Sequence, residues 1–147
     1  FPDAILATHA QCGDATALVD SERVDQLLRR LRDDPELAFE MLTDLTCVDL
    51  RGEEPRFEVV YHLYSVAKNH RVRLKARVWE ASPELPSAMA LWASADWMER
   101  EVWDLYGVRF RGHPDLRRIL LYDGFEGHPL RKDYPKEKRQ PLVGPRN

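Results

Sequence analysis

The sequence predicts an α+β fold, in which a mixed or antiparallel sheet has helices packed on one side and is followed by an irregular, proline-rich C-terminal tail. The chain has 147 residues, 44% hydrophobic and 32% charged, which is typical of one globular domain. In residues 71–79 cations alternate with apolar side chains, the period of a half-buried strand. In residues 95–105 apolar side chains recur at helical spacing. Five of the ten prolines lie after residue 107, where the regular patterns end.

The N-terminal part predicts two short strands and a helix. Residues 5–8 and 15–19 are short apolar runs, and Asp20 or Ser21 can cap the helix that follows. One face of this helix is apolar and consists of Val24, Leu27, Leu28 and Leu31. The helix is expected to end before Pro35, because proline disfavours helical geometry in the residue before it.

The middle of the chain predicts a hairpin and a second long helix. We expect, in order, a strand at 41–50, a turn at 51–55, strands at 57–66 and 71–79, a short helix at 86–92 and a longer helix to about residue 106. The longer helix would be capped by Ser94 or Asp96 and stopped by Gly107.

The apolar pattern of the two hairpin strands also predicts how they pair. If Val66 lies opposite Arg71, then Leu63 lies opposite Leu74 and the apolar side chains share one face. A slip of one residue would bury the cations, so that alternative is disfavoured.

The charges divide the chain into an acidic body and a basic tail. Residues 1–106 carry 12 Lys and Arg against 20 Asp and Glu, whereas residues 107–147 carry 10 against 5. We therefore divide the chain into a body at 1–107 and an extended basic tail at 108–147, within one structural domain. Only residues 119–122 of the tail resemble a buried segment, so the tail is expected to lie on the body or on a partner of opposite charge.

Several functional classes are disfavoured by what the sequence lacks. Cys12 and Cys47 are too few for an iron–sulfur cluster or a zinc finger within this chain. No apolar run approaches the roughly 20 residues of a membrane-spanning helix. Phosphate-binding glycine loops and nucleophile motifs are also absent from the sequence. We expect no self-contained active site.

Two groups of residues could carry chemistry, but each has a plainer interpretation. Glu99, Glu101 and Asp104 could act in acid–base catalysis or bind metals, although a solvated or interfacial helix with an Arg100–Asp104 ion pair is favoured. His113 and His128 occupy matching Gly-His-Pro turns and could bind metal or carry protons. The favoured interpretation is that each imidazole hydrogen-bonds to the backbone of its turn.

The cations of residues 71–77 and those of the tail could each form a binding surface. Nucleic acid or anionic lipid could bind such a row, but a solvated strand face with ion pairs is favoured for 71–77. Aromatic residues are sparse in the tail, so an acidic protein partner fits it at least as well as nucleic acid.

Two ordered motifs in the second half resemble one family. They are Glu-Arg-Glu-Val-Trp-Asp-Leu-Tyr-Gly-Val-Arg-Phe at 99–110, followed by Gly-His-Pro at 112–114, and Asp-Gly-Phe-Glu-Gly-His-Pro-Leu-Arg-Lys-Asp-Tyr-Pro at 123–135. They are similar to the C subunit of bacterial NADH-quinone oxidoreductase, which is the thirty-kilodalton subunit of respiratory complex I. Residues 45–49 and the hairpin at 57–79 resemble the body of that family.

The resemblance implies a non-catalytic structural subunit of the peripheral arm of a proton-translocating enzyme that passes electrons from NADH to quinone. The subunit would hold no cofactor itself, and FMN, iron–sulfur clusters and quinone would belong to partner subunits. It would pack against the quinone-site D subunit on the cytoplasmic side of the bacterial inner membrane, without a membrane span and without nucleic acid. The alternative is the equivalent subunit of a membrane-bound hydrogenase or another complex I-like oxidoreductase.

The motif residues are therefore expected at the partner interface. The candidates are Glu99, Arg100, Glu101, Asp104, His113, Arg117, Arg118, His128, Arg131, Lys132, Asp133 and Tyr134. Arg117, Arg118, Arg131 and Lys132 would pair with partner carboxylates, and Arg131→Ala would weaken assembly without changing the isolated fold.

Overall fold

A computed structural model describes residues 2–141 and 143 of the chain. The elements in chain order are η1 (Pro2–Ala4), β1 (Ile5–His9), η2 (Gln11–Gly13), β2 (Thr16–Val19), η3 (Ser21–Arg23), α1 (Val24–Asp33), β3 (Met41–Asp49), β4 (Phe57–Ser65), β5 (His70–Val78), β6 (Glu84–Pro86), α2 (Ala95–Tyr106) and β7 (Arg109–Arg111). Neither α-helix of the described chain is long and apolar enough to cross a membrane.

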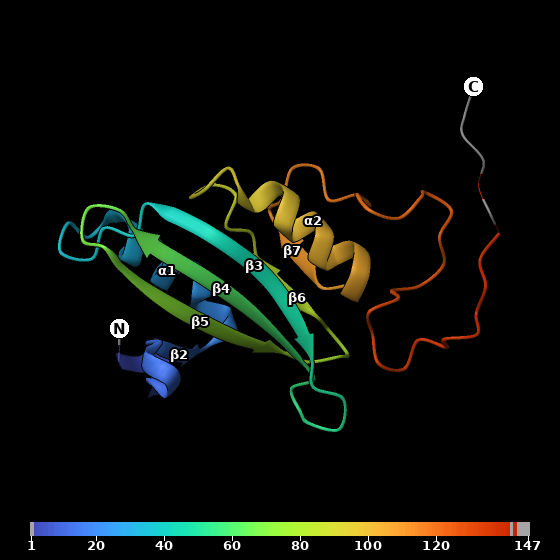
Figure 1. The fold of residues 1–147 in the computed structure, drawn as a ribbon, viewed down its shortest axis with the longest axis horizontal. Coiled ribbons are helices and arrows are strands. Elements are labelled where there is room, and N and C mark those ends of the chain that lie inside the picture. The colour runs from blue at the N-terminus through green and yellow to red at the C-terminus, as the bar shows by residue number, and fades with distance from the viewer. Residues whose placement is uncertain (1, 142, 144–147) are drawn as a thin grey trace.

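The main sheet is mixed and has five strands in the order β1-β2-β5-β4-β3 (Figure 1). Its neighbouring strands are antiparallel except for β2 and β5, which run parallel. The alternation along β4 places Phe57, Tyr61 and Leu63 on one face, where all three are buried. Leu28 of α1 and Val102 of α2 belong to the same core cluster, so both helices cover this face. The predicted α+β class is confirmed.

The first helix follows the sequence pattern closely. The Asp20 carboxylate accepts a hydrogen bond of 3.0 Å from the Glu22 amide and so caps the short turn η3 that leads into α1. Leu27 and Leu28 of α1 are buried, and the helix ends at Asp33, before Pro35. Burying each leucine contributes roughly 1.5–3 kcal/mol.

The register of the hairpin differs from the prediction by two residues. Leu63 lies opposite Val72 and not opposite Leu74, whose partner is Tyr61. The turn lies one residue earlier than expected and is stabilised by a hydrogen bond from the Lys68 amide to the Ser65 hydroxyl. Because a shift of two keeps every side chain on its face, the hydrophobic pattern cannot distinguish the two registers.

The connection between the sheet and α2 was predicted incorrectly. Residues 86–92 are not a short helix. Glu84–Pro86 instead form β6, which pairs in parallel with β7. The Ser87 amide extends this pairing by donating to the Arg111 carbonyl oxygen at 2.9 Å. A three-residue strand is too short to show a hydrophobic period, which explains why both strands were missed.

The end of α2 is as predicted. Gly107 takes a left-handed conformation with φ 76°, and its amide donates to the Trp103 carbonyl oxygen at 2.9 Å. Ser94 precedes the helix, but its hydroxyl donates to the Leu42 carbonyl oxygen of β3 and does not cap α2. From Gly112 to Pro141 the described chain has turns and bends without helix or strand. Since β7 pairs with β6, residues 109–111 adjoin the body, and the expected division at residue 107 stays a prediction.

Candidate subunit interface

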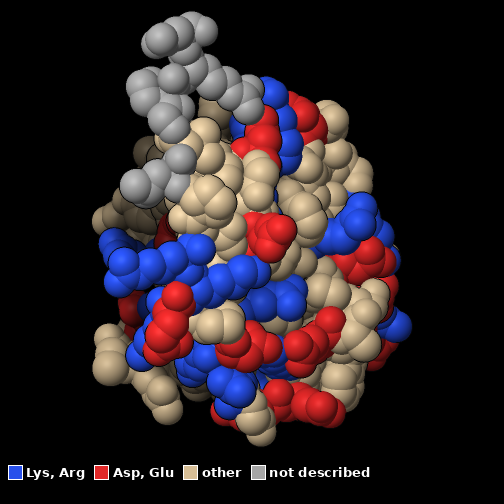
Figure 2. All heavy atoms as spheres, turned by 90° about the vertical axis from the view of Figure 1, so that its right-hand side faces the viewer, with Lys and Arg blue, Asp and Glu red and all other residues tan. Residues whose placement is uncertain are grey.

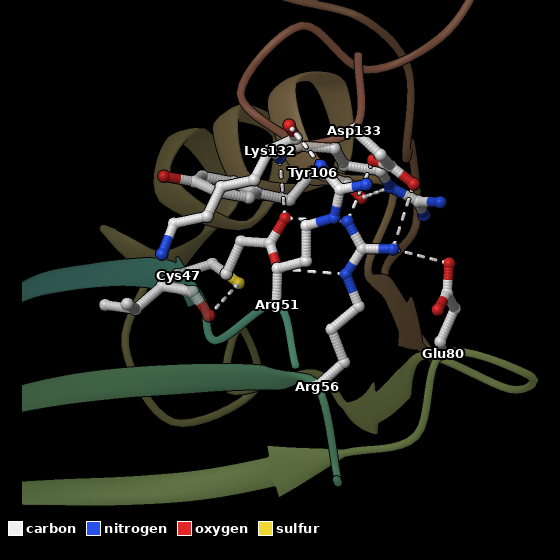
Figure 3. A network of polar contacts seen from close by, with 10 residues as sticks. Cys47, Arg51, Arg56, Glu80, Tyr106, Lys132 and Asp133 are labelled. Atoms are coloured by element: carbon white, nitrogen blue, oxygen red, sulfur yellow. Dashed lines mark hydrogen bonds and ion pairs between the residues drawn. The ribbon is translucent and has the colours of Figure 1, made fainter. Parts of the chain in front are cut away.

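Charged side chains of both signs gather on the side of the molecule that carries the tail (Figure 2). One group of them centres on Arg56, which lies just before β4 and has an exposed fraction of 6%. Its guanidinium forms two hydrogen bonds to Asp49, at 2.9 and 2.8 Å, and two to Asp133, at 2.8 and 3.1 Å (Figure 3). Glu80 accepts a further hydrogen bond at 2.6 Å. One buried cation thus joins the end of β3 to the tail.

The carboxylates of this group are stabilised in their ionised form. Hydrogen bonding to Arg56 lowers the pKa of Asp49, and it lowers the pKa of Asp133 to about 2. The Lys132 amide also donates to Asp49, at 2.7 Å. Because Asp49 is only 3% exposed, its negative charge depends on these partners.

A second group of contacts surrounds Asp104, whose side chain is fully buried in α2. Its Oδ2 accepts hydrogen bonds from three consecutive tail amides: Ile119 at 3.1 Å, Leu120 at 2.9 Å and Leu121 at 2.9 Å. Its Oδ1 pairs with Arg118 at 2.6 Å. Burial alone would raise the pKa of Asp104, but the hydrogen bonds from the Leu121 amide and from Arg118 outweigh it and hold this pKa below its ordinary value. This carboxylate therefore determines the path of the tail over α2.

Two arginines extend the contacts around Asp104. Arg118 also donates to the carbonyl oxygens of Phe125 and Gly127, at 2.8 and 3.0 Å, and so joins distant parts of the tail. Arg100 donates to the carbonyl oxygens of Arg117 and Arg118, both at 3.2 Å. The predicted Arg100–Asp104 ion pair is wrong, because Arg118 is the cation that pairs with Asp104.

The two histidines hold different parts of the backbone. The His113 Nδ1 accepts the Asp115 amide at 3.1 Å, within its own turn, as expected. His128 Nδ1 instead lies 2.9 Å from the Asp104 carbonyl oxygen. Since a carbonyl can only accept, this nitrogen carries the proton. Burial lowers the pKa of His128, which favours the neutral ring.

The junction between α2 and the tail is closely packed at Gly107. A Cβ at this position would lie 2.6 Å from the His128 ring and 2.7 Å from the Arg131 guanidinium. Arg131 donates to the Tyr106 carbonyl oxygen at 2.6 Å and lies 4.9 Å from the centre of the Phe57 ring. Glycine is required here both for space and for its positive φ.

Comparison with known proteins identifies the family. Residues 17–140 match the family described as respiratory-chain NADH dehydrogenase, 30 Kd subunit. The chain belongs to this family. It is therefore a subunit of an oxidoreductase complex, complex I, and other complex I subunits are its partners.

Relatives of this complex I subunit cover nearly all of it. The chain is 47% identical to the C subunit of the NADH-quinone oxidoreductase of Citrifermentans bemidjiense, over 98% of this chain and 89% of that protein. It is 51% identical to the C subunit of Roseiflexus castenholzii, over 92% of this chain and 78% of that protein. The C subunit numbered 2 of Rhizobium etli is 50% identical over 97% of this chain and 78% of its own length.

Solved structures show the same fold. A trypsin-resistant fragment (1-134) of Nqo5 superposes with a TM-score of 0.69 at 31% identity, covering 75% of this subunit and 89% of that chain. A chain of the archaeal membrane-bound sulfane sulfur reductase superposes with a TM-score of 0.75 at 23% identity, covering 89% of this subunit and 78% of that chain. The second likeness concerns the fold alone.

The structure divides the predicted interface residues of the subunit by exposure. Three are buried (Glu99, Arg100 and Asp104), five are partly buried (His113, Arg118, His128, Arg131 and Tyr134), and four are exposed (Glu101, Arg117, Lys132 and Asp133). The sequence reasoning missed Arg56, whose position seven residues after Asp49 across a turn is the only signal for their pairing. Many of the charged residues predicted to lie at the interface thus have partners inside the chain.

Glu99 is a buried carboxyl with an unusual environment. It is fully buried and accepts hydrogen bonds of 2.6 Å from both the Ser87 hydroxyl and the Ala88 amide. Burial raises its pKa to about 7, partly offset by these two hydrogen bonds. No cation pairs with Glu99 among the described residues, and the buried Tyr61 hydroxyl has no hydrogen-bond partner there. Within the same part of the chain no cluster of His, Cys, Asp or Glu could hold a metal ion.

Proposed function

We propose that this chain is a structural subunit of the peripheral arm of complex I, that it lies on the cytoplasmic side of the membrane, and that it docks on the quinone-site D subunit. In this proposal FMN, the iron–sulfur clusters and quinone belong to partner subunits, and this chain supplies position rather than chemistry. The observation that carries the proposal is the family match over residues 17–140, which includes the body and the tail together.

The contacts around Arg56 and Asp104 support a docking role. They hold the tail on the body beside the end of β3 and along the C-terminal half of α2, so a partner would meet an ordered surface. Preorganisation lowers the entropy cost of binding. Lys132 and Lys136 are exposed and have no ion-pair partner among the described residues, so they are available to partner carboxylates.

The proposal is tested by purification of the tagged full chain from native membranes, with the co-purifying subunits identified by mass. Recovery of a large quinone-site subunit together with flavin and iron–sulfur subunits is the expected result. Recovery of a hydrogenase large subunit in their place would support the alternative, the equivalent subunit of a membrane-bound hydrogenase or another complex I-like oxidoreductase. Recovery of the chain alone would refute both.

Arg131→Ala does not separate the effect of docking from the effect on the tail. The Arg131 guanidinium contacts Tyr106 and Phe57 inside the chain, so this variant should loosen the tail as well as any partner contact. Lys132→Ala removes an exposed ammonium while leaving the backbone contacts of the tail intact. It is therefore the cleaner variant for the charged part of the interface, with a binding loss within about tenfold because rim charges contribute little.

A further inference from the structure

The outer face of α2 carries apolar side chains that the described chain leaves largely or partly exposed. Trp97 is 60% exposed, and Glu101, one turn later, is exposed as well. Leu105, a further turn along, is partly buried. Residues four apart lie on one helix face, so these three point away from the core that Ala95 and Val102 face.

Two tail leucines are fixed beside this face. The Leu120 amide donates to Asp104 Oδ2 at 2.9 Å, and the Leu130 amide donates to the Leu105 carbonyl oxygen at 3.1 Å. Both backbones are therefore anchored to adjacent residues in the C-terminal half of α2. The two side chains are nevertheless 62% and 49% exposed.

Three charged residues beside this face are engaged in contacts inside the chain. Asp104, Arg118 and Arg131 bind one another, the tail backbone or the helix end. A charge that already has an internal partner gains little from a new contact, whereas exposed aromatic and large aliphatic groups gain by burial. What the surface formed by the outer face of α2 and these two leucines offers to a partner is thus mainly apolar.

The opposite face of the main sheet is a poorer candidate for docking. There Lys75 and Arg77 both pair with Glu58, at 2.8 and 3.1 Å. Val60, which lies opposite Lys75 between these strands, is only 5% exposed. The charges around Val60 are therefore satisfied by ion pairs within the chain.

We propose that Trp97, Glu101, Leu105, Leu120 and Leu130, the outer α2 surface, form the apolar anchor of the docking site. Its occupant is an apolar segment of the quinone-site subunit that presents a Lys or Arg to Glu101. The inference rests on the proposed function and deepens it. Glu101 is the carboxylate of this surface, and it has no ion-pair partner in the described chain, which argues for a cation on the occupant.

The anchor is partly preorganised before any partner arrives. The Arg100 guanidinium lies 5.3 Å from the centre of the Trp97 ring, and its own position is fixed by the two tail carbonyl oxygens. A cation over an indole face restrains the ring. Restrained aromatic groups are common at the energetic centres of interfaces.

The test measures binding of the purified full chain to the purified quinone-site subunit. Trp97→Ala and Leu120→Ser should each weaken binding by about 30-fold, the loss expected for residues that dominate an interface. Leu6→Ser and Val66→Ser are matched controls, because these side chains are 62% and 61% exposed but lie on β1 and in the hairpin turn. The controls should change binding by less than about twofold.

Charge reversal tests the second half of the inference. Glu101→Lys should weaken binding by about tenfold, and Glu101→Gln by less, because only the reversed charge repels the expected cation. Unfolding curves of all variants should match the wild type, since the substituted side chains are exposed. Wild-type binding by Trp97→Ala and Leu120→Ser would overturn the inference while leaving the proposed function intact.

Two other results would assign the surface differently. If these variants abolish self-association instead, the occupant is a second copy of this chain and the inference is wrong. If the wild-type chain does not bind the quinone-site subunit at all, the proposed function fails and the inference fails with it.

Discussion

Replacement of Arg56 by alanine should strongly destabilise the isolated chain. Arg56 is the cation for Asp49, which is 3% exposed, and for Asp133 and Glu80, which are partly open to solvent. Removing it leaves the Asp49 carboxylate buried with little more than the Lys132 amide as a partner. Breaking a buried ion pair in this way costs roughly 3–5 kcal/mol. The total free energy of unfolding of a domain of this size is about 5–15 kcal/mol.

The measurement is urea unfolding followed by circular dichroism, with thermal unfolding as a second probe. At about 2–4 °C per kcal/mol for a chain of this length, Tm should fall by roughly 6–20 °C. Arg29→Ala is the matched control, because Arg29 is exposed on α1 and has no ion-pair partner in the described chain. It should change stability by less than about 0.5 kcal/mol.

Two outcomes would refute this reasoning. If Arg56→Ala lowers the free energy of unfolding by less than about 1 kcal/mol, water replaces the guanidinium and Asp49 is not truly desolvated. If Arg56→Lys loses as much stability as Arg56→Ala, the positive charge contributes nothing, and the stabilisation comes from the geometry of the paired guanidinium hydrogen bonds. We expect Arg56→Lys to lie between the wild type and the alanine variant.

Three further predictions concern α2 and its ends. Asp104→Asn should cost about 2–4 kcal/mol, because the amide cannot accept all the hydrogen bonds of the carboxylate, and limited trypsin digestion should then cut after Arg118 faster than in the wild type. The pKa of Glu99 is raised to about 7 in the folded chain, so its contribution to stability is complete below about pH 4.5 and is lost as pH rises through 7. Glu99→Gln should therefore flatten the pH dependence of unfolding by an amount on the order of 3 kcal/mol, and an unchanged pH profile would contradict the burial argument. Gly107→Ala should cost more than about 1 kcal/mol through its φ of 76° and the contact with His128, measured by urea unfolding.

The elements with a clear period were predictable from the sequence, and the reason is physical. The alternation in β5 and the apolar stripe of α2 each repeat over two or more turns or pleats, so local sequence alone determines which face is buried. Gly107 was predictable because a helix end that needs a left-handed residue strongly selects glycine. These elements position the site but do not form it.

The contacts that form the site could not be predicted. Asp104 binds amides that lie 15 to 17 residues further along, and a backbone amide has no sequence signature. Arg56 meets Asp133 across 77 residues, and nothing local distinguishes it from other arginines. The motifs contain many of the residues that make these contacts, but the sequence could not tell which of their charged side chains point inward.

The parallel pairing of β2 with β5 has a consequence for synthesis of the chain. Thr16 pairs with Arg73, so β2 leaves the ribosome 57 residues before its partner. At about 5–20 residues per second, the N-terminal hairpin waits roughly 3–11 s for that partner. During this interval its strand edge is open to pairing with other chains. The β3–β4–β5 meander consists of neighbouring strands and can form by local contacts. We therefore expect β1 and β2, although made before their partner strand, to join the sheet last.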